Sequence, residues 1–299
     1  MSRPPALRDG DGIAVVAPSS PFDRERFERG VRALQEMGLE PRFGDGIHAR
    51  HAGYLAGPDA RRIDELVRAL RDPGARAIIL ARGGYGLLRI AAAIPRELLV
   101  KPVIGYSDAT VLHELWWRAG VPSIHGPMCT QLGEDPAAVE RLRALLVGSD
   151  PGPVRWTPRT ARPGRAEGPL RGGNLAVLAS LCGTPLQPSF RGSLVLLEDL
   201  NEPPYRLDRL CTQLLLSGAF EGAKGFVVGE LVGPGEPVEG REEAVAERLT
   251  ALGVPVVLGA PFGHGERNLP VALGVSHALD ADEGALTPLE PPVAKPGVS

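Results

Sequence analysis

Lysine and cysteine are scarce in this sequence of 299 residues, and it has no long apolar run. Lysine occurs only at positions 101, 224 and 295, the formal net charge is -3, and no basic stripe is present, which argues against a nucleic-acid partner. The separated Cys129, Cys182 and Cys211 form no CxxC pair and are typical of a reducing compartment. No segment predicts a membrane span, and the first 20 residues lack the apolar core of a signal peptide. We therefore expect a cytoplasmic protein that binds neither nucleic acid nor membrane.

The first half of the chain alternates short apolar runs with helical patterns. Strands are predicted at 12–19, 77–81 and 102–107, and each is followed by a segment with helical spacing of apolar residues. Strands and helices that alternate in this way form βαβ units around a mostly parallel sheet. We expect an α/β fold whose N-terminal domain is a doubly wound, mostly parallel sheet.

A change of composition after residue 148 predicts a domain boundary. Residues 151–167 are rich in Pro, Gly and Arg and lack periodicity, which is typical of a linker. The predicted domains are therefore 1–150 and 168–299. The second is expected to be mixed α/β, with helices at 174–181 and 205–216 and strands at 193–198, 225–231 and 255–260.

Three loops that follow predicted strands carry the residues of chemical interest, because ligands of parallel sheets bind where loops leave the carboxyl ends of strands. The first loop, ARGGYG at 81–86, has adjacent glycines that allow a backbone N–H to approach a ligand closely. An ordinary strand-to-helix turn also explains these glycines, and the glycines alone favour that interpretation.

The second loop, IGYSDAT at 104–110, puts Ser107 between the end of a strand and the start of a helix. A nucleophile elbow has this context, because it exposes the serine hydroxyl beside a helix N-terminus. The helix dipole and the N–H of Asp108 would then stabilise an oxyanion. Asp108 and Ala109 follow the serine, so the usual GxSxG pattern is not matched, and helix capping by Ser107 is the competing interpretation.

A nucleophilic serine needs a base, which is usually a histidine oriented by an acid. The third loop, FGHGERNLPVALG at 262–274, offers His264 between two glycines, where a core role explains it poorly. The remaining histidines are weaker candidates, because they fall in a helix (His113), in a lone HxxH pair of a loop (His48 and His51), before a rigid proline turn (His125) or in a late strand pattern (His277).

The segment LLEDLNEPPYRLDR at 196–209 supplies the candidate acids. Glu198 directly follows the apolar run SLVLL, at the end of a predicted buried strand, whereas an exposed helix accounts for Asp208 and a turn for Glu202. Capping of the following loop is the alternative role for Glu198. The order Ser107, Glu198, His264 is one in which catalytic triads occur along a chain.

Seven segments spread in order over nearly the whole chain resemble the LD-carboxypeptidase family of serine peptidases, which includes the microcin C immunity peptidases. These segments are AGPDARRIDEL, ARGGYG, IGYSDAT, IHGPM, LRGGNLAVLASLCGTP, LLEDLNEPPYRLDR and GHGERNLPVALG. The resemblance implies a catalytic triad of Ser107, Glu198 and His264, with the backbone N–H groups of Asp108 and Gly84 as oxyanion donors. It also implies an active site at the domain junction, a homodimer, and neither a metal nor a cofactor.

In terms of this family, the expected reaction releases the terminal D-alanine of a murein tetrapeptide by cleaving its bond to the L-centre of a diamino acid, in cell-wall recycling. Such a substrate ends in a carboxylate, so an arginine clamp is expected. Arg82 and Arg267 lie in the relevant loops, and Tyr85 is a further candidate contact. Two alternatives stay open: an immunity-type peptidase that cleaves aminoacyl-nucleotide amides with the same triad, and a non-enzymatic small-ligand binder with two α/β lobes.

Overall fold

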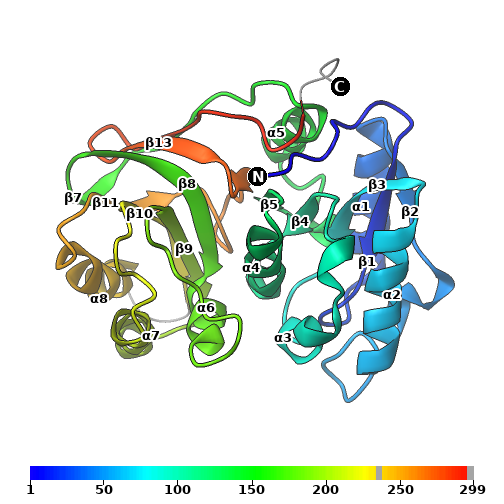
Figure 1. Cartoon of the computed structure of the whole chain (residues 1–299), viewed down its shortest axis with the longest axis horizontal. Helices are drawn as coiled ribbons and strands as arrows, with labels where there is room; N and C mark the ends of the chain where they lie inside the picture. The colour runs from blue at the N-terminus through cyan, green and yellow to red at the C-terminus, as the bar shows by residue number, and fades with distance from the viewer. Residues whose placement is uncertain (234–237, 295–299) are drawn as a thin grey trace. The chain divides into compact units, whose positions relative to one another are not determined.

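The computed structural model describes residues 1–233 and 238–294, which divide into two compact units (Figure 1). Unit 1 contains Met1–Pro151, Pro270–Ala272 and the described residues from Pro291 onward, and unit 2 contains Gly152–Leu269 and Leu273–Glu290. Both units combine helices with a β-sheet, which confirms the predicted α/β class. No helix in the described part of the chain has the length and apolar character needed to cross a membrane.

Unit 1 is built on a six-stranded sheet with the order β12-β5-β4-β3-β1-β2, in which the pairs from β2 through β5 are parallel. Its strands are β1 (Gly12–Val16), β2 (Glu40–Arg42), β3 (Ala75–Leu80), β4 (Val103–Gly105), β5 (Ser123–His125) and β12 (Val271–Leu273). The chain moves from β1 outward to β2 and then returns past β1 to β3. Because both crossovers are right-handed and run in opposite directions, α1 and α2 lie on opposite faces of the sheet. The direction of the strand order changes between β1 and β3, so the loops after these two strands flank a topological switch point.

The described residues of unit 1 also contain five α-helices and five short 3₁₀-helices. The α-helices are α1 (Arg24–Glu36), α2 (Asp59–Arg71), α3 (Leu87–Ile90), α4 (Thr110–Ala119) and α5 (Pro136–Val147). The 3₁₀-helices among the described residues are η1 (Asp45–His48), η2 (Ala91–Ala93), η3 (Arg96–Leu98), η4 (Ser107–Ala109) and η5 (Cys129–Gln131).

Local side-chain chemistry sets the ends of several of these helices. The Asp23 carboxylate accepts a hydrogen bond from Arg26 N at 2.8 Å and so begins α1. The Asp135 carboxylate does the same for α5, where Pro136 occupies the first turn. Helix α4 ends at Gly120, which has the left-handed φ of 71° that favours glycine.

Unit 2 is built on an eight-stranded mixed sheet with the order β6-β14-β13-β8-β9-β10-β11-β7. The central strands β8 to β11 are parallel, whereas β7, β13, β14 and β6 pair antiparallel with their neighbours. The strands are β6 (Val154–Arg155), β7 (Arg159–Arg162), β8 (Arg165–Asn174), β9 (Leu194–Leu200), β10 (Gly225–Val232), β11 (Val256–Ala260), β13 (Ser276–Asp280) and β14 (Ala285–Pro288).

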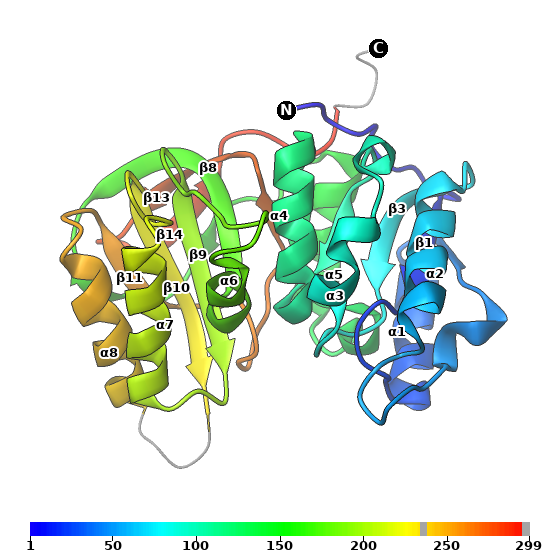
Figure 2. The same cartoon turned by 60° about the horizontal axis from the view of Figure 1, so that its bottom comes forward.

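Three helices cover one face of the parallel strands of unit 2, as Figure 2 shows: α6 (Leu175–Leu181), α7 (Pro204–Leu216) and α8 (Val238–Thr250). Their apolar residues pack on β9, β10 and β11 in a single buried cluster, which includes Leu178, Leu214, Leu249, Val195 and Val228. Burial of this apolar area is the main force that holds the layer together.

The structure corrects the prediction of a linker at 151–167, because this segment contains β6, β7 and the first residues of β8. Strand β6 pairs with β14 and β7 pairs with β11, so both lie at the edges of the sheet. Most side chains of β7 are exposed. An exposed edge strand is held by backbone pairing and needs no apolar alternation, so composition gives little sign of it.

We predict that Gly172→Ala destabilises unit 2. Gly172 lies in β8 with a φ of 123°, and a Cβ there would lie 2.0 Å from the carbonyl oxygen of Leu196 in β9. Backbone strain and this clash should lower the free energy of unfolding by about 2 kcal/mol or more, measured by urea denaturation.

Gly218→Ala is the matched control for this substitution. Gly218 also has a positive φ, 78°, but a Cβ there has no atom within 4 Å among the described residues. Gly218→Ala should therefore lower the free energy of unfolding by the backbone strain alone, about 1 kcal/mol. Equal denaturation midpoints for the two variants would contradict the account of β8 and β9.

Candidate active site

Ser107 lies on a sharp turn between strand β4 and helix α4, at the first residue of η4. Its φ is 61°, in the left-handed region that residues other than glycine seldom occupy. The turn is tight because Gly105 has no side chain: a Cβ there would lie 3.0 Å from the Cβ of Ala109. The chain thus forms the predicted strand–turn–helix elbow, with Ala109 in place of the usual second glycine.

The geometry argues against the capping interpretation of Ser107. Within the described residues, neither η4 nor α4 has a hydrogen bond from a side-chain cap, and the residue at the N-cap of η4 is Tyr106. A strained backbone at a serine that caps nothing is typical of a functional position. Asp108 follows in the first turn of η4, where backbone N–H groups have no partner within the helix.

The glycine loop that follows β3 packs against this elbow. A Cβ at Gly83 would lie 3.0 Å from the Cβ of Ser107, so the two backbones approach closely. Gly84 has a φ of 104°, and a Cβ there would lie 2.4 Å from Ser20 Oγ. Both glycines are therefore required for packing, which the simple turn interpretation of this loop did not anticipate.

Ser20 connects the loop after β1 to the glycine loop, a role that sequence reasoning missed. Its backbone N–H donates to the carbonyl of Gly83 at 3.2 Å, and its Oγ accepts from the backbone N–H of Tyr85 at 3.2 Å. The small-residue turn after the first predicted strand was the available signal, because it allows the two loops at the switch point to meet.

The side chain of Asp108 points into the protein. Its carboxylate accepts a hydrogen bond from Leu87 N, at the start of α3, at 2.9 Å, and it is almost fully buried. Burial raises the pKa of Asp108, although hydrogen bonds and the charge of Arg62 oppose the shift. The first-turn acid after Ser107 therefore joins the elbow to the end of the glycine loop.

Glu198 and His264, both in unit 2, form a directly hydrogen-bonded acid–base pair. Nδ1–H of His264 donates to Glu198 Oε2 at 2.6 Å. Glu198 lies within β9 and is fully buried, whereas 14% of the His264 side chain is exposed. The bond fixes the tautomer that leaves Nε2 to exchange a proton with a reactant.

Electrostatics keep the imidazole of His264 basic. Burial by itself lowers its pKa, but the hydrogen bond to Glu198 and the negative charges of Glu198 and Asp199 outweigh burial, so the pKa lies above its ordinary value. Burial, followed by the charge of Glu198, raises the pKa of Asp199 to about 7. Asp199 accepts from Ala176 N at 2.8 Å and Leu200 N at 2.7 Å, which sequence reasoning did not predict.

The loop that carries His264 is shaped by close backbone approaches. A Cβ at Gly263 would lie 2.6 Å from the Cβ of Glu198, so only glycine lets the loop descend onto the acid. Asn268 Oδ1 accepts from Gly263 N at 3.0 Å, and Glu230 accepts from Glu266 N at 3.2 Å. The two glycines that flank His264 in the sequence thus have a packing role.

The predicted substrate contacts are exposed. Arg82 donates from Nη1 to the carbonyl of Pro21 at 2.7 Å, and Arg267 is also on the surface of its unit. Tyr85 is 51% exposed, and its ring centroid lies 5.9 Å from that of Tyr54. These side chains are therefore accessible to a ligand.

Two of the other histidines, His113 and His48, have structural surroundings in unit 1. His113 bonds to Ser123 Oγ and to the carbonyl of Gly105, both at 2.9 Å, and burial lowers its pKa to about 4. The ring of His48 packs against Phe22 and Phe27. Within the described residues, no group of three or more His, Cys, Asp or Glu side chains is arranged to hold a metal ion.

A cavity of about 890 Å³ lies elsewhere in unit 1, beside β2 and α2. Its lining includes Arg42, Phe43, Arg61, Glu65 and Arg68, and none of the predicted site residues. The strained serine in unit 1 and the oriented imidazole in unit 2 are the groups described above that can supply a nucleophile and a base.

The chain matches the models of both domains of one peptidase family. Residues 13–126 match the LD-carboxypeptidase N-terminal domain, and residues 167–279 match the LD-carboxypeptidase C-terminal domain. Together the two matches cover most of the sequence, including the segments that carry the serine, the acid and the base.

Relatives of known name agree with these matches. A protein of Streptomyces coelicolor is 42% identical over 308 residues, with 99% of each chain covered. The murein tetrapeptide carboxypeptidase of Pseudomonas aeruginosa is 34% identical over 296 residues, with 90% of this chain and 93% of that protein covered. The Microcin C7 self-immunity protein MccF of Escherichia coli is 25% identical, with 92% of each chain covered.

Two solved structures have a similar fold. The muramoyltetrapeptide carboxypeptidase of Oxalobacter formigenes superposes with a TM-score of 0.80 at 28% identity, over 92% of this chain and 97% of that one. MccF in complex with glutamyl sulfamoyl guanosine gives a TM-score of 0.86 at 23% identity, over 98% and 100% of the two chains. The chain therefore belongs to the LD-carboxypeptidase family of serine peptidases.

Proposed function

We propose that this protein is a serine carboxypeptidase that removes the terminal D-alanine of a murein tetrapeptide, with Ser107, Glu198 and His264 as its catalytic triad. The hydrogen bond of 2.6 Å between His264 and the buried Glu198 carries this proposal, because it prepares an imidazole to act as a general base. The backbone N–H groups of Asp108 and Gly84 are the proposed oxyanion donors.

The reaction requires the serine of unit 1 to meet the imidazole of unit 2 at the scissile carbonyl. His264 Nε2 takes the proton of Ser107 as Oγ attacks, and Glu198 stabilises the imidazolium that forms. The two N–H groups stabilise the tetrahedral oxyanion. The imidazolium then protonates the leaving amine of D-alanine, and a water molecule, activated by His264, hydrolyses the acyl-enzyme and regenerates the serine.

The names of the relatives support a murein peptide as the substrate, since the Pseudomonas aeruginosa protein is named a murein tetrapeptide carboxypeptidase. Arg82 and Arg267 are the proposed partners of the terminal carboxylate of the substrate, with Tyr85 beside them. An immunity-type activity on aminoacyl-nucleotide amides is the second candidate, which the likeness to MccF favours. The homodimer and the cytoplasmic location stay predictions.

Ser107→Ala should abolish D-alanine release. The purified protein is incubated with L-Ala-γ-D-Glu-meso-diaminopimelyl-D-Ala, and the products are measured by mass spectrometry. Loss of the nucleophile should reduce kcat on the order of 10⁴-fold or more. Ser180→Ala is the control. Ser180 is exposed on α6, and among the described residues its hydroxyl donates only to the carbonyl of Val177 in the same helix, so the activity of this variant should match the wild type.

A loss of only a few-fold in Ser107→Ala would contradict the triad. A folded wild type that releases no D-alanine but cleaves an aminoacyl sulfamoyl adenosine would identify the immunity-type activity instead. If the protein binds the tetrapeptide without cleaving it, and Ser107→Ala binds equally well, the small-ligand binder is the correct class.

The value of kcat/KM should rise with pH through the pKa of His264, because only the neutral imidazole can accept the serine proton. Since the pKa of His264 is raised by Glu198, the rising limb of the wild type should lie above about pH 6.5. In Glu198→Gln, burial is the main remaining effect on the pKa of His264, and burial lowers this pKa. The rising limb of the kcat/KM profile should therefore move to lower pH, while the plateau of the profile falls roughly 10²- to 10⁴-fold. A limb that stays in place in Glu198→Gln would show that another group controls it.

A further inference from the structure

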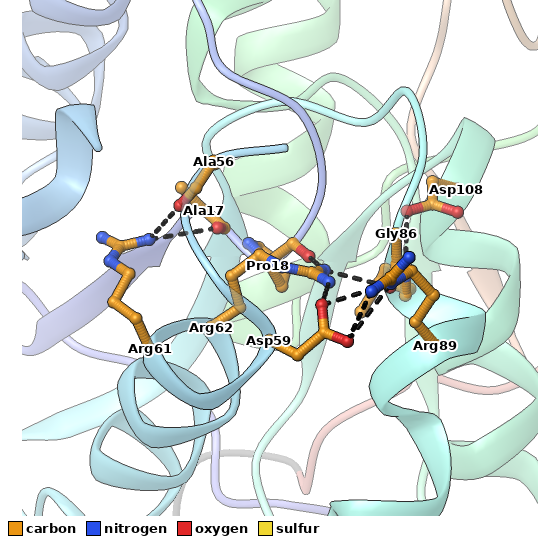
Figure 3. A network of polar contacts seen from close by, with 10 residues as sticks. Ala17, Pro18, Ala56, Asp59, Arg61, Arg62, Gly86, Arg89 and Asp108 are labelled. Atoms are coloured by element: carbon orange, nitrogen blue, oxygen red, sulfur yellow. Dashed lines mark hydrogen bonds and ion pairs between the residues drawn. The ribbon is translucent and has the colours of Figure 1, made fainter. Parts of the chain in front are cut away.

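Arg62, on helix α2, has a fully buried side chain that the proposed mechanism does not use (Figure 3). Its Nη1 donates to the carbonyls of Pro18 and Gly86, the latter at 2.9 Å, and its Nη2 donates to Asp59 Oδ1 at 2.6 Å. Burial of a guanidinium is costly unless several partners compensate it. The three acceptors compensate the burial of the Arg62 guanidinium, so Arg62 holds these backbone and carboxylate groups in fixed positions.

The two carbonyls that Arg62 holds belong to the two loops that flank the switch point of the sheet. Pro18 follows β1, two residues before Ser20, and Gly86 ends the glycine loop after β3. Gly86 has a φ of 137°, and a Cβ there would lie 2.6 Å from Nη1 of Arg62. The absence of a side chain at Gly86 thus lets the guanidinium reach the backbone. One planar group fixes the separation of the two loops.

The same contacts extend to the elbow that carries the nucleophile. Asp108, the residue after Ser107, accepts from Leu87 N, which is the residue after Gly86. The chain from Gly84 to Leu87 is thereby held by Ser20 at its start and by Arg62 and Asp108 at its end. All of these groups lie in unit 1, so their arrangement is internal to one unit.

Asp59 keeps the guanidinium in place from the solvent side. Its Oδ2 accepts from Arg89 Nη2 at 2.9 Å, while its Oδ1 accepts from Arg62. The shared carboxylate orients Arg62 toward Pro18 and Gly86 (Figure 3). Arg62 uses one nitrogen, Nη1, for the carbonyls of Pro18 and Gly86 and a second, Nη2, for Asp59. Lysine has a single nitrogen on a flexible stem, so it cannot hold all three acceptors in this geometry.

We propose that Arg62 is a positioning residue of the proposed hydrolytic site: by tying Gly86 to Pro18, it aims the N–H of Gly84 at the same point as the N–H of Asp108, where the oxyanion forms. This inference rests on the proposed function. A displacement of about 1 Å in such a donor can cost about 100-fold in rate, so a residue that touches no substrate can still govern the chemical step.

The test is Arg62→Lys, which keeps a positive charge near Asp108 but loses the fork. The expected result is a kcat for D-alanine release that falls roughly 10- to 100-fold with a KM within about 3-fold of wild type, because the oxyanion donors act in the transition state. The second-order rate of fluorophosphonate labelling should fall by a similar factor. The dissociation constant of the tetrapeptide, measured in the Ser107→Ala background, should stay unchanged.

Arg61→Lys is the matched control on the same helix. Arg61 donates to the carbonyls of Ala56 at 2.6 Å, Ala17 at 3.5 Å and Gly46, and to Glu65 at 2.7 Å. It has no hydrogen bond to Gly86 or Asp108 among the described residues. The kcat and the labelling rate of Arg61→Lys should stay within about 3-fold of wild type even if the thermal midpoint of the variant falls, because Arg61 makes no hydrogen bond to the glycine loop among the described residues.

If Arg62→Lys does not fold, Asp59→Asn serves in its place, because Asp59 is partly exposed and this change weakens its ion pairs with Arg62 and Arg89 without removing the guanidinium of Arg62. It should lower kcat and the labelling rate about 3- to 10-fold with KM unchanged. A folded Arg62→Lys or Asp59→Asn protein with wild-type kcat, or with a changed KM alone, would overturn the inference and leave the proposed function intact. A wild type that neither releases D-alanine nor reacts with the fluorophosphonate would contradict both.

Discussion

The hydrogen bond between Glu198 and His264 is the interaction on which the functional account depends. A fully buried carboxylate is unfavourable unless a partner compensates it, and the imidazole of His264 is the partner that reaches Glu198 Oε2. The loop of His264 can meet the acid because Gly263 has no side chain to obstruct it. The parallel pairing of β8, β9 and β10 in turn holds Glu198 at the centre of the sheet.

A second constraint acts in unit 1, where the order of the parallel strands brings three loops to one edge of the sheet. The loops after β1, β3 and β4 contain Ser20, Gly84 and Ser107, and they pack so closely that glycine is required at two of the contacts. The strained φ of Ser107 persists because these neighbours determine its backbone. The proposed nucleophile and oxyanion donors therefore follow from topology as well as from side-chain identity.

Much of this arrangement could be predicted from the sequence. Apolar runs identified β1, β3, β4, β9, β10 and β11, because buried parallel strands are rich in aliphatic residues. The turn at Ser107 and the acid–base pair were predictable because Ser107 and Glu198 end or follow such runs, and His264 lies between two glycines in the loop after another. The edge strands β6 and β7 were not, since their side chains are largely exposed and their pairing partners are distant in the sequence. The role of Arg62 was also hidden, because a buried arginine in a helix has the same sequence pattern as an exposed one.

The most direct test of the central claim is to map the covalent adduct of an active-site fluorophosphonate by peptide mass spectrometry, in the wild type and in His264→Ala. One adduct is expected, on the peptide that contains Ser107, and labelling should be slowed at least about 100-fold in His264→Ala, because the imidazole activates the serine. An adduct on a different serine, or equal labelling rates in the two proteins, would contradict the claim that Ser107 and the Glu198–His264 pair act together.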